Sequence, residues 1–465
     1  MQTHLKALLS ALIFSTLLYS KSFGLNLLLV AVLVIALLIT VRKERPLAWA
    51  YLLAYFFTGS MVFVAPTTLN IGVHFITLVV LVGKSIALDT SIYLSGFIGL
   101  LNLITASIAH LVEGLHTGPK AQKSSTLNAK AVVYLKGAFI AGVLGFVFVL
   151  LYRKANPIFE ELVSTVDFSF ISFPWVLFTL IGYLLFLHLL RPFYPKELID
   201  LDVNTGNTLA PPSSEFSSLL RKKLGNEHTL ASIIFTVLNV LLVFFLVTDV
   251  LYLLAPNISS NAQYSQSVHQ GVYALLFSIV CAIIVILYFF RGNLNFFTKN
   301  TQLKRLTYTW IGLNLILIGF TAYKNAVYID ALGFTYKRIG VFIYLLLTLV
   351  GLITTYYKVA QVKNLLFLVR TNLASVFVFF VLSTAVPWDQ MITKYNLSQL
   401  NNPDISYLIS LGKSNSDILY RYMHHNNSSM PPEERNAVIA KYTQFKQWQE
   451  AKTWQEYTLY QFVKH

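Results

Sequence analysis

Long apolar runs separated by short polar segments make up most of the chain. Each run is roughly 15–25 residues of nearly continuous hydrophobic side chains, which is the length needed to cross a bilayer as a helix. Barrel strands would instead show ten-residue segments of alternating polarity, so the pattern predicts helices. We expect them near residues 6–20, 23–41, 47–65, 67–83, 132–152, 172–190, 230–254, 269–290, 308–323, 339–357 and 362–383.

The stretch 86–112 is long enough to cross as well, but its polarity makes it ambiguous. Lys84 precedes it, and Asp89 and Ser91 lie in its first turns. If it crosses, there are twelve spans, and the basic segments 42–45 and 113–131 fall on opposite sides. If it is interfacial or re-entrant, eleven spans remain and the basic loops gather on one side. Because Lys and Arg in short loops mark the cytoplasmic side, the pattern favours eleven spans.

The same charge pattern predicts an orientation. We expect the N-terminus in the cytoplasm as a retained first helix, because no small-residue cleavage site follows its apolar run. The Pro- and Ser-containing linker near 191–229 also falls inside, whereas the C-terminal tail falls outside.

The composition changes after residue 384, which divides the chain into an expected helix bundle at 1–384 and an expected extracytoplasmic helical tail at 385–465. Asp404 is positioned to cap a short helix that ends near Gly412, and Ser414 to cap another. Apolar residues between 438 and 448 recur at helical spacing. The tail is short for an independent core, so we expect its helices to pack on one another or on the membrane face.

Composition restricts the class of protein. The 465 residues are 56% hydrophobic and only 12% charged, with a mean hydropathy of +0.63. Soluble domains carry about 25% charged residues, so the fold class is an all-α polytopic membrane bundle. The net charge of +15 does not indicate nucleic-acid binding, because the cations lie in loops between apolar runs. Cys281 is the only cysteine, and no motif indicates a cofactor or a metal.

Ionisable residues near apolar runs are the first candidate site. Asp249 interrupts an apolar run close to its predicted outer end, and Lys324 and Arg338 flank spans at the same predicted depth. An ionisable side chain inside a membrane is expensive and needs a partner. Three interpretations stay open: an ion pair between helices, a proton or solute site, and catalysis.

Acidic residues in a predicted outer loop form the second candidate. Glu160, Glu161 and Asp167 lie between two spans, where membrane glycosyltransferases that use lipid-linked sugars often place acids. Their spacing also fits a short amphipathic helix lying on the bilayer. The loop therefore allows a transferase without indicating one.

A set of residues in two neighbouring apolar runs forms a recognisable pattern: Leu238, Asn239, Val240, Leu241, Tyr252, Leu253, Leu254, Tyr264, Gln270, Gly271, Val272 and Tyr273. With these residues the sequence resembles a bacterial multi-pass membrane family catalogued only as a domain of unknown function. The similarity extends to 24–29, 307–318 and 407–412, and the family implies a bacterial inner-membrane location but no activity.

These observations leave three hypotheses for function. The first is a non-enzymatic sensing, scaffold or partner-binding protein that meets an envelope protein through its tail. The second is a transporter or channel for a proton or small solute, and the third is an integral-membrane transferase. The lipid bilayer is the expected environment in all three, and the sequence does not indicate an oligomeric state.

Overall fold

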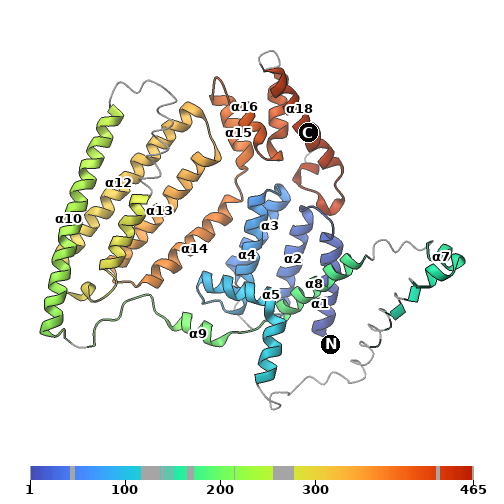
Figure 1. The fold of residues 1–465 in the computed structure, drawn as a ribbon, viewed down its shortest axis with the longest axis horizontal. Helices are drawn as coiled ribbons and strands as arrows, with labels where there is room; N and C mark the ends of the chain where they lie inside the picture. The colour runs from blue at the N-terminus through green and yellow to red at the C-terminus, as the bar shows by residue number, and fades with distance from the viewer. Residues whose placement is uncertain are drawn as a thin grey trace. The chain divides into compact units, whose positions relative to one another are not determined.

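A computed structural model describes residues 2–41, 48–116, 151–164, 172–213, 215–254, 277–425 and 430–462, with a few positions between 137 and 149. For 106–116, 162–164 and 252–254 it describes the backbone alone. These residues form helices and their connections, with no strand among them (Figure 1). The all-helical prediction is therefore confirmed for the described part of the chain.

Six of the described helices are long and apolar enough to cross a membrane, and four shorter apolar helices accompany them. Most of the predicted span near 132–152 and the start of the one near 269 lie outside the described residues. The stretch 86–112 falls on α5 (Ile92–His116), whose apolar part Ile92–Thr105 is one of the shorter helices. The count of eleven crossings stays a prediction. The six long helices are α4 (Thr68–Ile86), α8 (Phe173–Leu190), α10 (Ser218–Leu254), α12 (Thr301–Leu332), α13 (Tyr336–Ala360) and α14 (Leu365–Ser383).

The chain forms two compact units. The first comprises residues 1–90, 94–199 and 452–465, and the second comprises 91–93 and 200–451. In the first unit α1 packs along α8, α2 packs on α3, and α3 packs on α4. The additional helices of this unit are α1 (Gln2–Leu18), α2 (Leu25–Val41), α3 (Trp49–Val64) and α7 (Pro157–Ser164).

Small residues allow α4 and α5 to cross at backbone contact. A side chain at Gly83 would collide with the carbonyl of Ser95, and one at Gly99 would collide with the carbonyl of Val79. Such crossings are common between helices in lipid, where close backbone approach maximises van der Waals contact. The two glycines are therefore required by packing.

The last residues of the chain fold onto the first unit and form what we call the C-terminal strap, residues 452–462. Glu456 accepts hydrogen bonds from both the backbone N–H and the hydroxyl of Ser22, at 2.7 and 2.9 Å. The N–H of Leu25 donates to the Tyr457 carbonyl at 2.7 Å. A side chain at Gly24 would overlap the strap backbone. The strap is thus fixed to the turn between α1 and α2.

In the second unit α10, α12, α13 and α14 form a bundle in which α12 packs on both α10 and α13, and α13 packs on α14. Two helices are longer than their predicted spans, because polar residues beyond the apolar window continue the helix. α10 begins at Ser218 rather than near 230, and α12 runs from Thr301 to Leu332 rather than 308–323. Lys324 is consequently inside α12, and does not follow it.

The outward side of α10 is mostly apolar between Leu230 and Leu251. The side chains of Ile233, Val237, Val240, Phe244 and Val247 are each about half exposed or more. A water-soluble protein would not leave such a continuous apolar stripe in contact with solvent. The stripe is what a lipid-facing helix surface requires.

The part of the tail that belongs to the second unit, residues 388–450, forms a helical module that we call the tail module. Ile392, Leu408, Leu419 and Val438 lie in its core. The predicted Asp404 cap is confirmed, since its carboxylate accepts the Tyr407 N–H at 2.8 Å. The predicted Ser414 cap is wrong, because its hydroxyl donates to Asp389 and the next helix begins at Ser416. The module's helices are α15 (Trp388–Gln399), α16 (Ile405–Ser410), α17 (Ser416–His425) and α18 (Pro432–Glu450).

The tail module and the linker that follows α9 (Lys196–Asn204) contact opposite ends of α13. At the first turn of α13, Tyr336 donates its hydroxyl to Asp389 of the module at 2.6 Å. Beyond the last turn, the Leu209 N–H of the linker donates to the Val362 carbonyl at 3.0 Å. A helix of 25 residues is about 37 Å long, which exceeds the thickness of a bilayer core.

The docking of the strap is expected to depend on pH through Glu456. Burial alone would raise the pKa of Glu456, but hydrogen bonds from Thr453 and Ser22 outweigh it and lower the pKa to about 2. The ionised group therefore stabilises the docked strap at neutral pH, and this contribution is lost as the pH falls from 4.5 towards 2. Hydrogen exchange of amides 453–461 in the full-length protein, corrected for intrinsic rates, should accelerate across that window.

Glu456→Gln should remove this pH dependence, and Glu450→Gln, at an exposed position on α18, should retain it. An identical pH response in the wild type and in Glu456→Gln would contradict the assignment.

Candidate functional site

The centre of the candidate site is an ion pair between α10 and α12. The Lys324 ammonium donates to the Asp249 carboxylate at Oδ1. Only 8% of the Asp249 side chain and 13% of the Lys324 side chain are exposed. The helix bundle brings these two side chains together because α10 and α12 pack along each other. The pair lies inside protein and not on the lipid-facing stripe.

The second carboxylate oxygen of Asp249 has no such partner. Oδ2 is buried and has no hydrogen-bond partner among the described residues. A buried, unpaired oxygen is costly, about 1–3 kcal/mol. It is also the atom at which a proton, a water molecule or a cation can bind while Lys324 holds Oδ1.

Arg338 does not join this pair. Its guanidinium donates to the carbonyls of Leu332 and Gly333 at the end of α12, and it lies 4.1 Å from the centre of the Tyr328 ring. A cation at a helix C-terminus satisfies carbonyls that lack a partner within the helix. The geometry therefore gives Arg338 the role of capping α12, whereas the sequence placed it with Asp249.

The turn between α12 and α13 is held by the tail module. Asn396 accepts the Phe334 N–H at 2.6 Å and donates to the Phe334 carbonyl at 3.0 Å, so it satisfies both backbone groups of one residue. Gly333 adopts a φ of +80°, and a side chain there would overlap Asn396. Tyr395 also donates to Asp330 at 2.9 Å. The helix that carries Lys324 is thus fixed at its end by the module.

The outer-loop acids do not form an enclosed site. Glu160 and Glu161 are both exposed on α7, and Glu160 pairs with Arg153 at 3.5 Å on the surface. Asp167 lies outside the described residues. Two of the three carboxylates therefore face solvent, which fits the amphipathic-helix interpretation better than a catalytic site.

A second buried charge cluster was missed by sequence reasoning. Arg370 on α14 donates to the Asp202 carboxylate at 3.0 Å, and to the Asn207 side chain at 2.7 Å. Asp202 also accepts the Ser91 N–H and the Tyr93 hydroxyl. Burial would raise the pKa of Asp202, but these hydrogen bonds outweigh it and hold the pKa below its usual range. No short-range pattern links residues 168 positions apart, so only a known fold could reveal this pairing.

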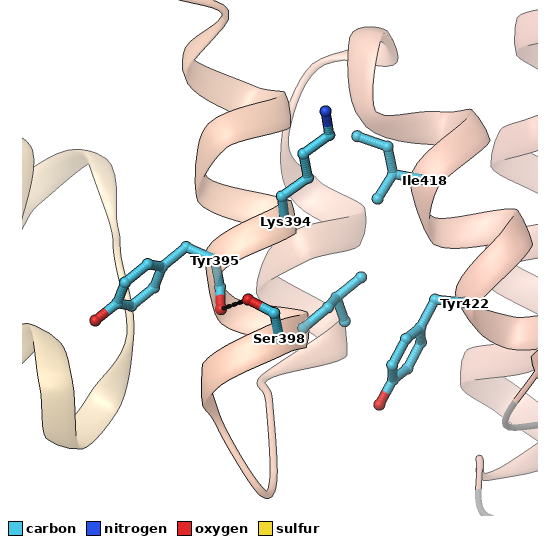
Figure 2. A pocket seen from close by; sticks show the side chains of 6 residues that line it. Lys394, Tyr395, Ser398, Ile418 and Tyr422 are labelled. Atoms are coloured by element: carbon cyan, nitrogen blue, oxygen red, sulfur yellow. Dashed lines mark hydrogen bonds between the residues drawn. The ribbon is translucent and has the colours of Figure 1, made fainter.

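The tail module carries a shallow open groove of about 420 Å³ between α15 and α17, lined by Lys394, Leu397, Ser398, Ile418 and Tyr422 among others. Figure 2 shows the Lys394 amine near Ile418, and the Ser398 hydroxyl directed at the Tyr395 carbonyl, 3.1 Å away. The groove is mostly apolar. Among the described residues, no cluster of His, Cys, Asp and Glu is arranged to hold a metal ion.

The Asp249–Lys324 pair should show strong energetic coupling. Lys324→Met would leave the buried Asp249 carboxylate without its cation, and Asp249→Asn would remove the carboxylate that balances the Lys324 charge, so each should cost about 3–5 kcal/mol of unfolding free energy. The double variant should cost clearly less than the sum. Denaturant titration of the purified protein in detergent measures the cycle. Additive single effects would show that the two groups do not interact.

Glu160→Gln is the matched control, because the exposed Arg153–Glu160 pair should contribute less than about 1 kcal/mol.

Comparison with known proteins gives a family without an activity. No curated protein and no solved structure matches the chain. One family model matches residues 4–422, which includes most of both units and ends within α17. This agrees with the resemblance carried by 238–254 and its neighbours. The chain belongs to the family described as domain of unknown function DUF4153.

Proposed function

We propose that the chain is a non-catalytic, multi-pass inner-membrane protein of bacteria that binds an envelope partner through its tail module and transmits that binding to the bundle. The observation that carries the proposal is the pair of hydrogen bonds between the Asn396 side chain and the backbone of Phe334 in the turn. A module joined by a loose linker could bind a partner without any effect on the bundle. This module is joined through partly buried hydrogen bonds to the turn that follows α12.

Two features support an external position for the module. It contacts the turn between α12 and α13, which the charge pattern assigns to the outside, while the linker contacts the opposite end of α13. In the second unit, the tail module therefore makes these hydrogen bonds at the end of α13 that is opposite the linker.

A transferase is less well supported, because Glu160 and Glu161 face solvent. A transporter is the second candidate, and the unpaired oxygen of Asp249 is the observation that favours it.

Site-specific photocrosslinking in intact cells tests the proposal. A photoreactive residue at Ile439 or Lys394, both exposed on the module, should yield a discrete adduct with one envelope protein. The same residue at Leu219, exposed at the opposite end of the second unit's bundle, should not. The adduct should persist in Asp249→Asn, since partner binding does not require the intramembrane carboxylate.

Partner binding by the module would be contradicted if both module positions gave adducts with lipid alone. It would also be contradicted if Leu219 gave the same protein adduct. Loss of the adduct in Asp249→Asn without loss of the folded protein would favour transport as the primary function.

A further inference from the structure

The buried face of α10 carries four polar side-chain atoms that have no hydrogen-bond partner among the described residues. They are Nε2 of His228, Oγ of Ser232, Oδ1 of Asn239 and Oδ2 of Asp249. All four atoms are enclosed by protein. His228, Ser232 and Asn239 are separated by four and seven residues, which places them on one face of the helix. Asp249 is ten residues beyond Asn239 and lies about a quarter of a turn from that face. We call these four positions the stripe.

This stripe has the length of a membrane. His228 and Asp249 are 21 residues apart, which corresponds to about 31 Å along a helix, close to the 30 Å of a hydrocarbon core. His228 lies in the half of the helix that the charge pattern places towards the inside, ten residues after its start at Ser218, and Asp249 lies near the end that the pattern places outside. A proton-binding group therefore lies at each end, with hydroxyl and amide groups between.

The stripe faces other helices of the same unit and not lipid. Asn239 donates its amide to the Leu306 carbonyl of α12 at 3.0 Å, and Lys324 of α12 holds Asp249. The His228 ring lies 5.8 Å from the ring of Phe297. The lipid-facing residues of α10, such as Val237 and Val240, lie on a different face.

α12 carries buried polar side chains between Leu306 and Lys324, the two residues that contact the stripe. Between Asn239 and Asp249 the stripe on α10 holds Leu242 and Leu246, but the buried part of α12 carries Asn314 and Thr321. Both donate to carbonyls of their own helix, Trp310 and Leu317, so neither needs a partner on another helix. Their oxygen atoms stay available as acceptors for water.

We propose that the buried face of α10, with α12, encloses a file of water molecules that conducts protons between His228 and Asp249. Buried polar groups in proteins find a partner, and water is the partner when no protein group is present. A water molecule forms two to four hydrogen bonds, so a file of them satisfies the unpartnered atoms of the stripe. Ionisable residues inside membranes mark proton pathways of this kind.

A proton moves along the file from one water molecule to the next. Each water molecule accepts one proton from its neighbour and releases one to the next. At the outer end Oδ2 of Asp249 accepts the proton, which neutralises the carboxylate and weakens its attraction for Lys324. Release of the proton to the outside restores the ion pair. The direction of net movement follows the proton gradient.

Proton flux into liposomes that contain the purified full-length protein tests the proposal. A potassium diffusion potential drives proton entry, and a pH-sensitive dye trapped inside reports it. Wild type should acidify the lumen at least tenfold faster than protein-free liposomes. Asp249→Asn and Asn239→Leu should each reduce the difference at least fivefold.

Thr236→Val is the matched control, because Thr236 lies on the same helix, is exposed on its outer side, and donates only to the Ser232 carbonyl. Its flux should stay within twofold of wild type. Wild-type flux equal to that of protein-free liposomes, or undiminished flux in Asn239→Leu, would overturn the proposal.

A second measurement tests whether water reaches the stripe, and it leaves Asp249 unchanged. In a Cys281→Ser background, a single cysteine at position 232 or 239 should react with a small water-soluble thiosulfonate at least tenfold faster than one at position 236. Thiol modification needs the thiolate, which forms in water and not in lipid. Equal, slow reaction at all three positions would also overturn the proposal.

Discussion

A backbone N–H or C=O that is buried in apolar surroundings must be paired, and this requirement determines how the turns of this protein are built. Within a helix the backbone pairs with itself, but each end leaves unpaired groups. Buried asparagines supply the missing partners, because one amide both donates and accepts. Asn26 forms hydrogen bonds with backbone groups of the turn before α2. Asn102 and Asn396 each bind both the N–H and the carbonyl of a distant phenylalanine. The turns are therefore fixed parts of the structure.

Buried cations follow the same requirement. The ammonium groups of Lys84, Lys358 and Lys441 and the guanidinium of Arg338 donate to backbone carbonyls, several of them near the end of a helix. These residues complete caps, and nothing about their geometry indicates chemistry. Asp249 differs from the three lysines, because one of its oxygens is left without a described partner. Three further atoms without a described partner lie on the same helix as Asp249, and this grouping on α10 is what marks the stripe.

Sequence patterns predicted what depends on neighbouring residues. Apolar runs located the long apolar helices among the described residues, and Asp404 was predicted as a cap three residues before its partner. Helix ends were missed where polar residues prolong α10 and α12, since hydropathy reports burial in lipid and not helix length. Contacts between distant residues gave no local signal: Ser22 with Glu456, Asp202 with Arg370, and the asparagine–phenylalanine contacts. The sequence paired Asp249 with Lys324 only because both were expected at the same depth in the membrane. The Asp249 carboxylate and the Lys324 ammonium are in contact. The role of the pair stays a prediction.

The central claim is that the second unit crosses the membrane with the tail module outside and the linker inside. Single cysteines in a Cys281→Ser background test it most directly, at Ser398 on the module and at Ser213 in the linker, both exposed. A membrane-impermeant maleimide applied to intact cells should label position 398 and should label position 213 only after the membrane is permeabilised. Labelling of position 213 alone, or of both positions equally, in intact cells would contradict the account.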